Sequence, residues 1–138
     1  MRGDVRVAVR CGCGLPAVIE THPLVDGEPF PTLYWLTCRR ANHAIGRLEA
    51  AGVMRDLTER LRTDEDFARS YEQADADYRR RRDARHPLTG CGGIGGGPSD
   101  RIKCLHAQYA HHLVCECNPV GAWVADQIGD VLQSPPCV

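Results

Sequence analysis

Long apolar runs are missing from this 138-residue chain, and no stretch approaches the roughly 18–20 residues that cross a bilayer. Residues 1–10 alternate charged and β-branched side chains and lack the apolar core of a signal peptide. Neither sign of charge is in excess: the net charge of −1 gives no bulk attraction to nucleic acid or to an anionic membrane. Lysine is nearly absent, with Lys103 the only one among 17 basic residues. We therefore expect a cytoplasmic protein with no membrane partner and no nucleic-acid partner.

Cysteine and histidine, by contrast, are plentiful, with 8 and 6 copies. In a cytoplasmic chain this many thiols favours metal or redox roles over structural disulfides. The alternative is that Cys91, Cys115, Cys117 and Cys137 are small buried hydrophobic side chains. A chain of this length can bury a core without a metal. We expect a single α+β domain over residues 1–133 and a frayed tail over 134–138.

Three strands are predicted in the N-terminal third. Val5, Val7 and Val9 alternate with charged residues, the pattern of a half-exposed strand. Residues 15–21 form a second apolar run, and the β-branched and aromatic run over 32–38 indicates a buried third strand. The prolines and the Asp-Gly pair within 22–31 indicate a loop. The short connections favour a three-stranded antiparallel sheet, which needs a helical layer over one face to be stable.

About four helices are predicted to follow. Helical spacing of apolar residues runs from about Arg40 to Arg62, with Gly52 as a break. Thr63 is predicted to cap the next helix, with Asp66 completing a capping box, and Pro87 ends it.

The last two helices are predicted on either side of Asn118. The third helix is predicted to begin at a cap on Ser99 or Asp100 and to run to about Glu116. The fourth follows Asn118 through Leu132.

Two segments resemble ligand-binding motifs without their structural context. Gly90 to Gly95 spells a G-x-G-x-x-G pattern, but it follows a helix and not a strand, so a flexible link or a mobile flap is the better interpretation. The run from Arg79 to Arg82 lacks interleaved aromatic residues. We interpret it as a solvated helix end balanced by acidic residues, and not as a nucleic-acid surface.

The strongest functional signal is the set of three cysteines and three histidines between Lys103 and Cys117. Thiolates and imidazoles are preferred ligands of zinc and of iron. In a helix Cys104 and His106 point to nearly opposite sides, and Cys104 and His111 lie about 10 Å apart along the axis. We therefore expect Cys104 to meet ligands from the sheet. The predicted metal ligands are Cys11, Cys38, Cys104, His111 and His106, the two histidines competing for the fourth position, with zinc as the favoured metal.

Three other interpretations stay open. Cys104 lies in the first turns of its helix beside Lys103, which favours a reactive thiolate, with His106 or His111 as a base. His111 and Cys115 are four residues apart and can form a second, wholly helical metal site. A protein-interaction adaptor that binds through the arginine-rich helix is the third, so the partner is either a small molecule or a protein.

Several segments together resemble a known family. They are Arg10-Cys11-x-x-Gly14-x-Pro16, Pro29-Phe-Pro-Thr-Leu-Tyr34, Arg47-Leu-Glu49, Lys103-Cys-Leu-His106 and Asn118-Pro-x-Gly121. The chain is identified by them as a member of the bacterial domain-of-unknown-function family 501, over about residues 5–125. The resemblance implies no established activity. It implies that Cys11, Cys104, His106 and His111 lie in family motifs and that position 38 accepts His as well as Cys. The additional cysteines keep an iron–sulfur cluster as an alternative to zinc.

Overall fold

The computed structural model describes residues 5–88 and 90–132 and has an α+β architecture. A three-stranded antiparallel sheet has the order β1-β2-β5, formed by Val5–Arg10, Pro16–Thr21 and Tyr34–Leu36. The predicted loop over 22–31 contains a small hairpin of β3 (Leu24–Val25) and β4 (Glu28–Pro29). The prediction of an α+β fold with a three-stranded antiparallel sheet is confirmed, and the predicted tail over 134–138 lies outside the described residues.

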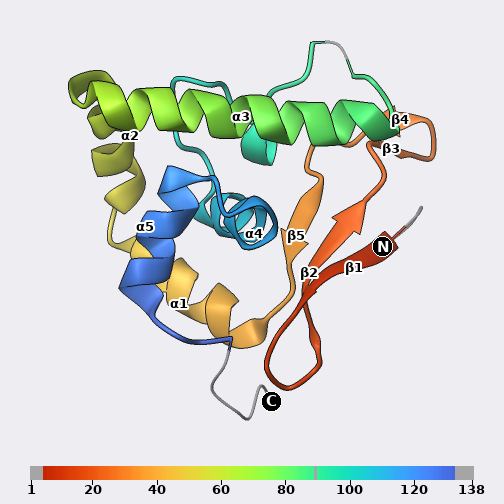
Figure 1. Ribbon diagram of the computed structural model, residues 1–138, viewed down its shortest axis with the longest axis horizontal. Coiled ribbons are helices and arrows are strands. Elements are labelled where there is room, and N and C mark those ends of the chain that lie inside the picture. Colours follow the sequence, from red (N-terminus) through yellow and green to blue (C-terminus); the bar gives the residue numbers. More distant parts are fainter. Residues whose placement is uncertain (1–4, 89, 133–138) are drawn as a thin grey trace.

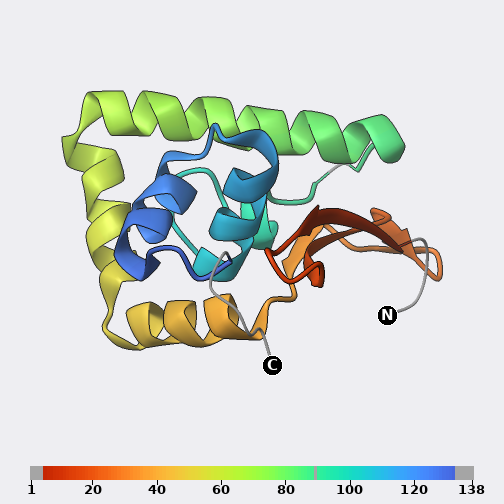
Figure 2. The same cartoon turned by 60° about the horizontal axis from the view of Figure 1, so that its bottom comes forward.

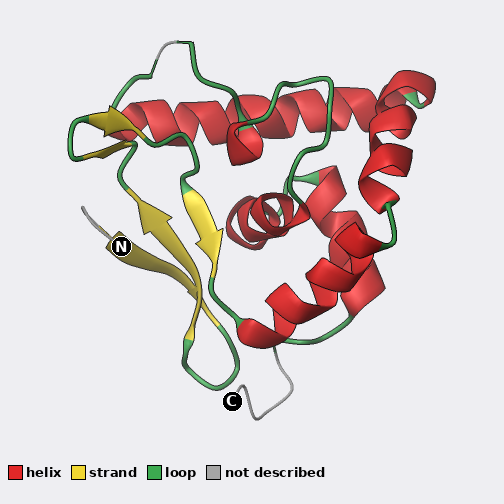
Figure 3. Cartoon of the chain, turned by 180° about the vertical axis from the view of Figure 1, so that it is seen from behind, coloured by secondary structure: helices red, strands yellow, loops and turns green. Residues whose placement is uncertain are grey.

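Three helices form a frame around two others. Figure 2 shows α1 (Arg39–Ala50), α2 (Val53–Thr63) and α3 (Glu65–Arg85) along three sides of the molecule, enclosing α4 (Leu105–Cys115) and α5 (Pro119–Ile128). The sheet closes the fourth side, and β5 packs directly against α4 (Figures 1 and 3). Helix α4 therefore lies at the centre and contacts α1, α5 and β5. Of the described part of the chain, no helix is both long enough and apolar enough to cross a membrane.

The buried core joins the sheet to all of these helices. Tyr78 of α3 is fully buried, and its hydroxyl accepts the backbone N–H of Leu33 at 2.5 Å, which ties the long helix to the segment before β5. The same core contains buried side chains from both layers, among them Val18, Ile45, Leu105, Val120 and Val124. Burial of apolar area at this junction is the main force that holds sheet and helices together.

Local signals placed some helix ends correctly and others wrongly. Gly52 separates α1 from α2 with φ +82, as predicted for a break, and Asn118 caps α5 by accepting two backbone N–H groups. The predicted cap at Thr63 is wrong: Thr63 ends α2, and Asp64 caps α3 by accepting the N–H of Phe67.

The boundaries of the last two helices also differ from the prediction. The cap predicted at Ser99 or Asp100 is wrong, since α4 begins after Cys104. The final helix ends at Ile128, earlier than predicted, because Gly129 takes a positive φ.

The glycine segment is packed against the helices, contrary to the prediction of a flexible link or a mobile flap. A 3₁₀ turn, η1 (Ile94–Gly96), is closed by the hydrogen bond from Gly96 N–H to the Gly93 carbonyl at 2.9 Å, and the Gly93 N–H donates to the Gly97 carbonyl at 2.9 Å. Ile94, the first residue of this turn, is buried. A Cβ added to Gly93 would overlap the Asp75 carboxylate of α3. The absence of side chains here permits close packing of the backbone.

Arginines of α3 hold this segment in place. Arg82 is buried and donates to the Gly92 carbonyl at 2.6 Å, and Arg79 donates to the Cys91 carbonyl at 3.3 Å. Arg80 and Arg81 pair with Asp77 at 2.9 and 2.7 Å. The interpretation of the run as a solvated helix end therefore holds for Arg80 but is wrong for Arg82, which has a structural role.

We expect Gly93→Ala to lower the free energy of unfolding by about 2 kcal/mol or more, because the new methyl group overlaps a buried carboxylate. Gly46→Ala is the matched control: its Cβ meets nothing within 4 Å and lies inside α1, so helix propensity favours it by up to about 1 kcal/mol. Urea unfolding measures both. Equal stability of Gly93→Ala and the parent would contradict the packing of this segment.

Candidate functional site

The N-terminus of α4 brings Cys104 and His106 together. Cys104 is the N-cap residue, with φ −144 and ψ 113, and its backbone is extended and not helical. Residues two apart within a helix point to nearly opposite sides, but this rule does not apply to Cys104, which lies just before the first helical residue. The expectation that Cys104 and His106 point to opposite sides is wrong for this reason, and their ligand atoms lie within 4.8 Å of each other.

Glu49 of α1 completes the group. Its Oε2 accepts the backbone N–H of Leu105 at 2.9 Å, a hydrogen bond that satisfies one of the unpaired donors at the start of α4. The same oxygen lies 3.3 Å from Nδ1 of His106. Nε2 of His106 lies 3.3 Å from the Asn42 carbonyl, so oxygen acceptors face both ring nitrogens. Asn42 is itself fixed, because its amide donates to the carbonyls of Leu36 and Cys38.

Electrostatics favours the charged forms of Cys104 and His106. Burial alone would raise the pKa of the Cys104 thiol, but hydrogen bonds from His106 and from the backbone N–H of Ala107 outweigh it and lower that pKa. The hydrogen bond to Cys104 and the charge of Glu49 outweigh desolvation and raise the pKa of His106 to about 9. At neutral pH these shifts favour a thiolate beside an imidazolium.

The pair opens onto a cavity of about 530 Å³ between β5 and α4. Aromatic side chains of β5, Tyr34 and Trp35, form one wall, and Lys103 adds a positive charge. Gly95 of the glycine segment closes another side: a Cβ at this position would lie 3.3 Å from the Cys104 Cβ. The site thus lies between the sheet and the Cys104 helix and has an aromatic wall and two basic groups.

The two sheet cysteines lie elsewhere. Cys11 follows β1 and Cys38 precedes α1, and both line a separate cavity of about 390 Å³. Cys11 and Cys38 therefore lie close to each other, at the ends of their strands. Among the described residues, no group of three or more potential metal ligands contains either of them. The structure therefore does not bring Cys11 and Cys38 to Cys104.

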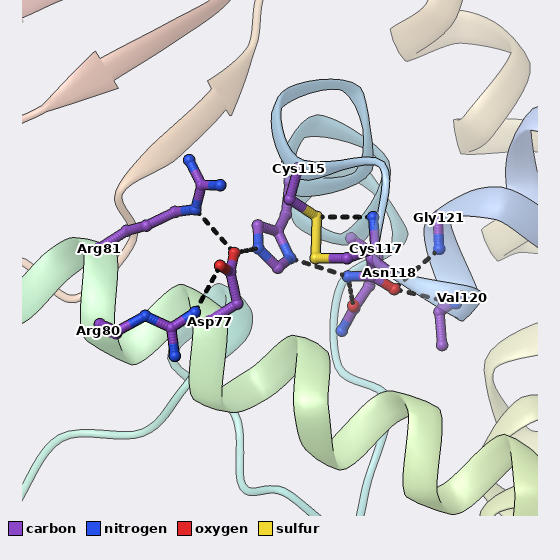
Figure 4. Close-up of a disulfide and its surroundings, with 10 residues drawn as sticks. Asp77, Arg80, Arg81, Cys115, Cys117, Asn118, Val120 and Gly121 are labelled. Carbon is purple, nitrogen blue, oxygen red and sulfur yellow. Dashed lines mark hydrogen bonds and ion pairs between the residues drawn. A yellow bond between two sulfur atoms is a disulfide. The ribbon is translucent and has the colours of Figure 1, made fainter.

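His111, another predicted ligand, lies in a buried network toward the other end of α4 (Figure 4). Its Nε2 lies 2.9 Å from Asp77 Oδ2, and its Nδ1 lies 3.2 Å from the Asn118 amide nitrogen. Desolvation lowers the pKa of His111, although the carboxylate of Asp77 opposes this shift. Desolvation raises the pKa of Asp77, but hydrogen bonds from His111 and Arg81 outweigh it and lower that pKa.

Two groups of side chains are close enough to hold a metal ion. One is Glu49, Cys104 and His106; the other is Asp77, His111, Cys115 and Cys117, and in each the donor atoms lie within 4.8 Å of one another. Cys115 and Cys117 are joined by a disulfide. An iron–sulfur cluster is ordinarily held by four thiolates, and neither group among the described residues contains more than two cysteines.

A larger cavity, of about 600 Å³, lies between α1 and α5 and is lined by Arg39, Arg40, His43 and Arg47. It contains neither thiol nor carboxylate, so size alone does not identify the chemical site. We place the site at Cys104, where titratable groups converge on a cavity.

The family model for the protein of unknown function DUF501 matches residues 7–126 of this chain. The chain belongs to that family. No curated protein and no solved structure matches it. Family membership names no reaction, so the chemistry has to be inferred from the site itself.

Sequence reasoning missed Glu49, Asn42 and Asp77. Glu49 and Asn42 come from α1, more than 50 residues before Cys104, and only tertiary packing brings them together. The Arg47-Leu-Glu49 segment was among those that carry the family resemblance, so a signal for Glu49 existed without a role attached to it. Asp77 was missed because the acidic residues of its helix were interpreted only as balancing the charges of the arginines.

We expect His106 to titrate with a midpoint near pH 9, measured by NMR of the imidazole protons. Because the folded-state pKa lies above the ordinary value of 6.5, the contribution of this charge to stability is fully present below about pH 6.5 and is lost as pH rises through about 9. Cys104→Ser should lower the midpoint by more than one unit, since the thiol is the largest cause of the shift. A midpoint near 6.5 in the parent protein would contradict the ion pair.

Proposed function

We propose that the protein is a thiol-dependent enzyme in which Cys104 is the nucleophile and His106 its proton donor. The observation that carries the proposal is that oxygen acceptors face both nitrogens of His106, beside a thiol whose pKa is lowered. An imidazolium fixed in this way stabilises the thiolate, which is the reactive form of cysteine. Glu49 acts as a positioning residue that orients the ring and the first turn of α4.

The surroundings of the thiolate indicate a small acyl substrate with a negative charge. Lys103, the imidazolium and the positive N-terminal end of the α4 helix dipole give the cavity a positive character. Trp35 offers a flat apolar surface beside them. In the proposed step the Cys104 sulfur forms a bond to the acyl carbon, the bond to the leaving group breaks, and His106 transfers its proton to that group. A thioester of Cys104 and neutral His106 remain, ready to activate water.

The pH dependence of alkylation tests the thiolate directly. We expect iodoacetamide to modify Cys104 at pH 6–7 faster than it modifies Cys91, as followed by mass spectrometry. His106→Asn should slow the reaction of Cys104 about tenfold at that pH, because a rise of one unit in the thiol pKa reduces the thiolate fraction tenfold.

Glu49→Gln should shift the same alkylation profile by a smaller amount, since it acts through the ring, and Cys91→Ser is the control that leaves it unchanged. A Cys104 profile that does not respond to His106→Asn would overturn the proposal.

A second candidate is a zinc site built from the same residues. Glu49, Cys104 and His106 supply three ligands of types that zinc accepts, and the fourth position would face the cavity, an arrangement typical of catalytic zinc. The Asn42 carbonyl supports this candidate, because a ligating histidine usually donates its second N–H to such a group. Of the five ligands predicted from the sequence, this proposal keeps Cys104 and His106.

For the zinc candidate we expect one zinc per chain in competition with a chromophoric chelator, with affinity lowered at least tenfold by Cys104→Ser and by Glu49→Gln. Bound zinc should also protect Cys104 from iodoacetamide. Cys38→Ser is the matched control and should leave the affinity unchanged, because Cys38 lines a different cavity. An equal loss in Cys38→Ser would move the metal to the sheet cysteines.

A further inference from the structure

A disulfide joins Cys115, the last residue of α4, to Cys117, two residues later. Glu116 between them takes a left-handed conformation with φ 56, which turns the chain back so that the two sulfurs meet. Cys117 is exposed, whereas Cys115 is partly buried. Figure 4 shows the disulfide beside Asp77 and Asn118. It lies at the C-terminal end of α4, whereas Cys104 caps the N-terminal end.

This disulfide is poorly suited to stabilising the fold. A cross-link removes entropy from the unfolded chain in proportion to the logarithm of the loop that it closes, and only one residue lies between these cysteines. The end of α4 is already secured by Asn118, which caps α5 and donates to Gln108 at 2.8 Å. The disulfide therefore adds little stability beyond that of these hydrogen bonds. A chemical role explains it better than a structural one.

The two sulfur atoms have different environments. The backbone N–H of Cys117 donates to the sulfur of Cys115 at 3.0 Å, an interaction that stabilises negative charge on Cys115. The sulfur of Cys117 belongs to an exposed residue that an incoming thiol can reach. In thiol–disulfide exchange the accessible sulfur is attacked and the sulfur that is the more stable thiolate leaves.

The hydrogen bonds of His111 oppose metal binding by the second group of potential ligands, in which His111 lies beside the two cysteines. Asn118 uses its side-chain oxygen to accept the N–H groups of Val120 and Gly121, so its amide nitrogen must face Nδ1 of His111. Nδ1 therefore accepts, and Nε2 carries the proton that is donated to Asp77. Neither nitrogen offers a lone pair to a metal ion while these hydrogen bonds hold.

We propose that Cys115 and Cys117 are a redox-active dithiol–disulfide pair that exchanges electrons with dithiols, separately from the chemistry at Cys104. A thiolate of the dithiol attacks the Cys117 sulfur, the bond between the two cysteine sulfurs breaks, and Cys115 leaves as a thiolate. The second thiol of the reductant gives its proton to Cys115 and attacks the reductant's own sulfur in the mixed disulfide, releasing Cys117 as a thiolate. Cys117 then takes up from water the proton that the first thiol of the reductant lost on ionising. The protein disulfide is reduced to two thiols and the dithiol is oxidised to a cyclic disulfide, with no other reactant.

The first experiment measures the redox equilibrium of the pair in the full chain. Lys103 is the last residue at which trypsin cleaves, so Cys104→Ser combined with Cys137→Ser leaves Cys115 and Cys117 as the only cysteines of the C-terminal peptide. The protein is equilibrated with reduced and oxidised dithiothreitol in varied ratio, trapped with maleimide and analysed by mass spectrometry. We expect a single transition between no adduct and two adducts within the accessible ratios. A peptide that carries two adducts at every ratio, or none at any, would overturn the proposal.

The second experiment tests the direction of attack in the same background. With oxidised glutathione, Cys115→Ser leaves the exposed Cys117 and should form the mixed disulfide at least tenfold faster than Cys117→Ser, which leaves Cys115. Equal rates in the two variants would overturn the assignment of Cys117 as the attacked sulfur.

Zinc provides the third readout. The reduced protein in the Cys104→Ser background should bind zinc no more tightly than its Cys117→Ser and Asp77→Asn variants. Zinc binding that both substitutions abolish would make this group a metal site and overturn the redox proposal.

Discussion

The position of α4 depends on a buried chain of hydrogen bonds that links three helices. Gln108 donates to the Tyr71 hydroxyl at 2.8 Å, Asn118 donates to Gln108, and His111 bridges Asn118 to Asp77. Buried polar groups are costly when unpaired, so each member holds its neighbours in one arrangement. Burial accordingly raises the pKa of Tyr71 to about 12 and keeps it a neutral partner. Because α4 carries Cys104 at one end and Cys115 at the other, this network sets the position of both thiol sites.

Much of the fold could be predicted because its signals are local. Alternation of valines located β1, Gly52 separated two helices, and Asn118 carries both the side chain and the following proline of a helix start. The start of α4 was predicted wrongly because Ser99 and Asp100 are better N-cap residues by type than Cys104. The segment between them is instead held by contacts that come from elsewhere, such as the backbone N–H of Ile102 on Thr58.

Part of the site was predicted from the sequence, and the rest depends on tertiary contacts. Cys104 and His106 were selected by residue type, but helical geometry was applied to a residue that lies just outside the helix, so their direct contact was not foreseen. Likewise, Arg79 and Arg82 each donate to a backbone carbonyl of the glycine segment, and no pattern in the sequence identifies these contacts. A run of arginines can therefore be structural even where composition favours a solvated surface.

The length of α4 has a consequence for how the two thiol sites communicate. Its 11 residues extend over about 16 Å, whereas two cysteines must have Cα atoms within about 7 Å to form a disulfide. A rigid rod of this length keeps Cys104 and Cys115 from ever joining covalently within one folded molecule. Oxidation at Cys115 can reach Cys104 only through a diffusing thiol or disulfide, or through a second copy of the chain. The central helix thus keeps the two thiol sites apart as well as holding each of them in position.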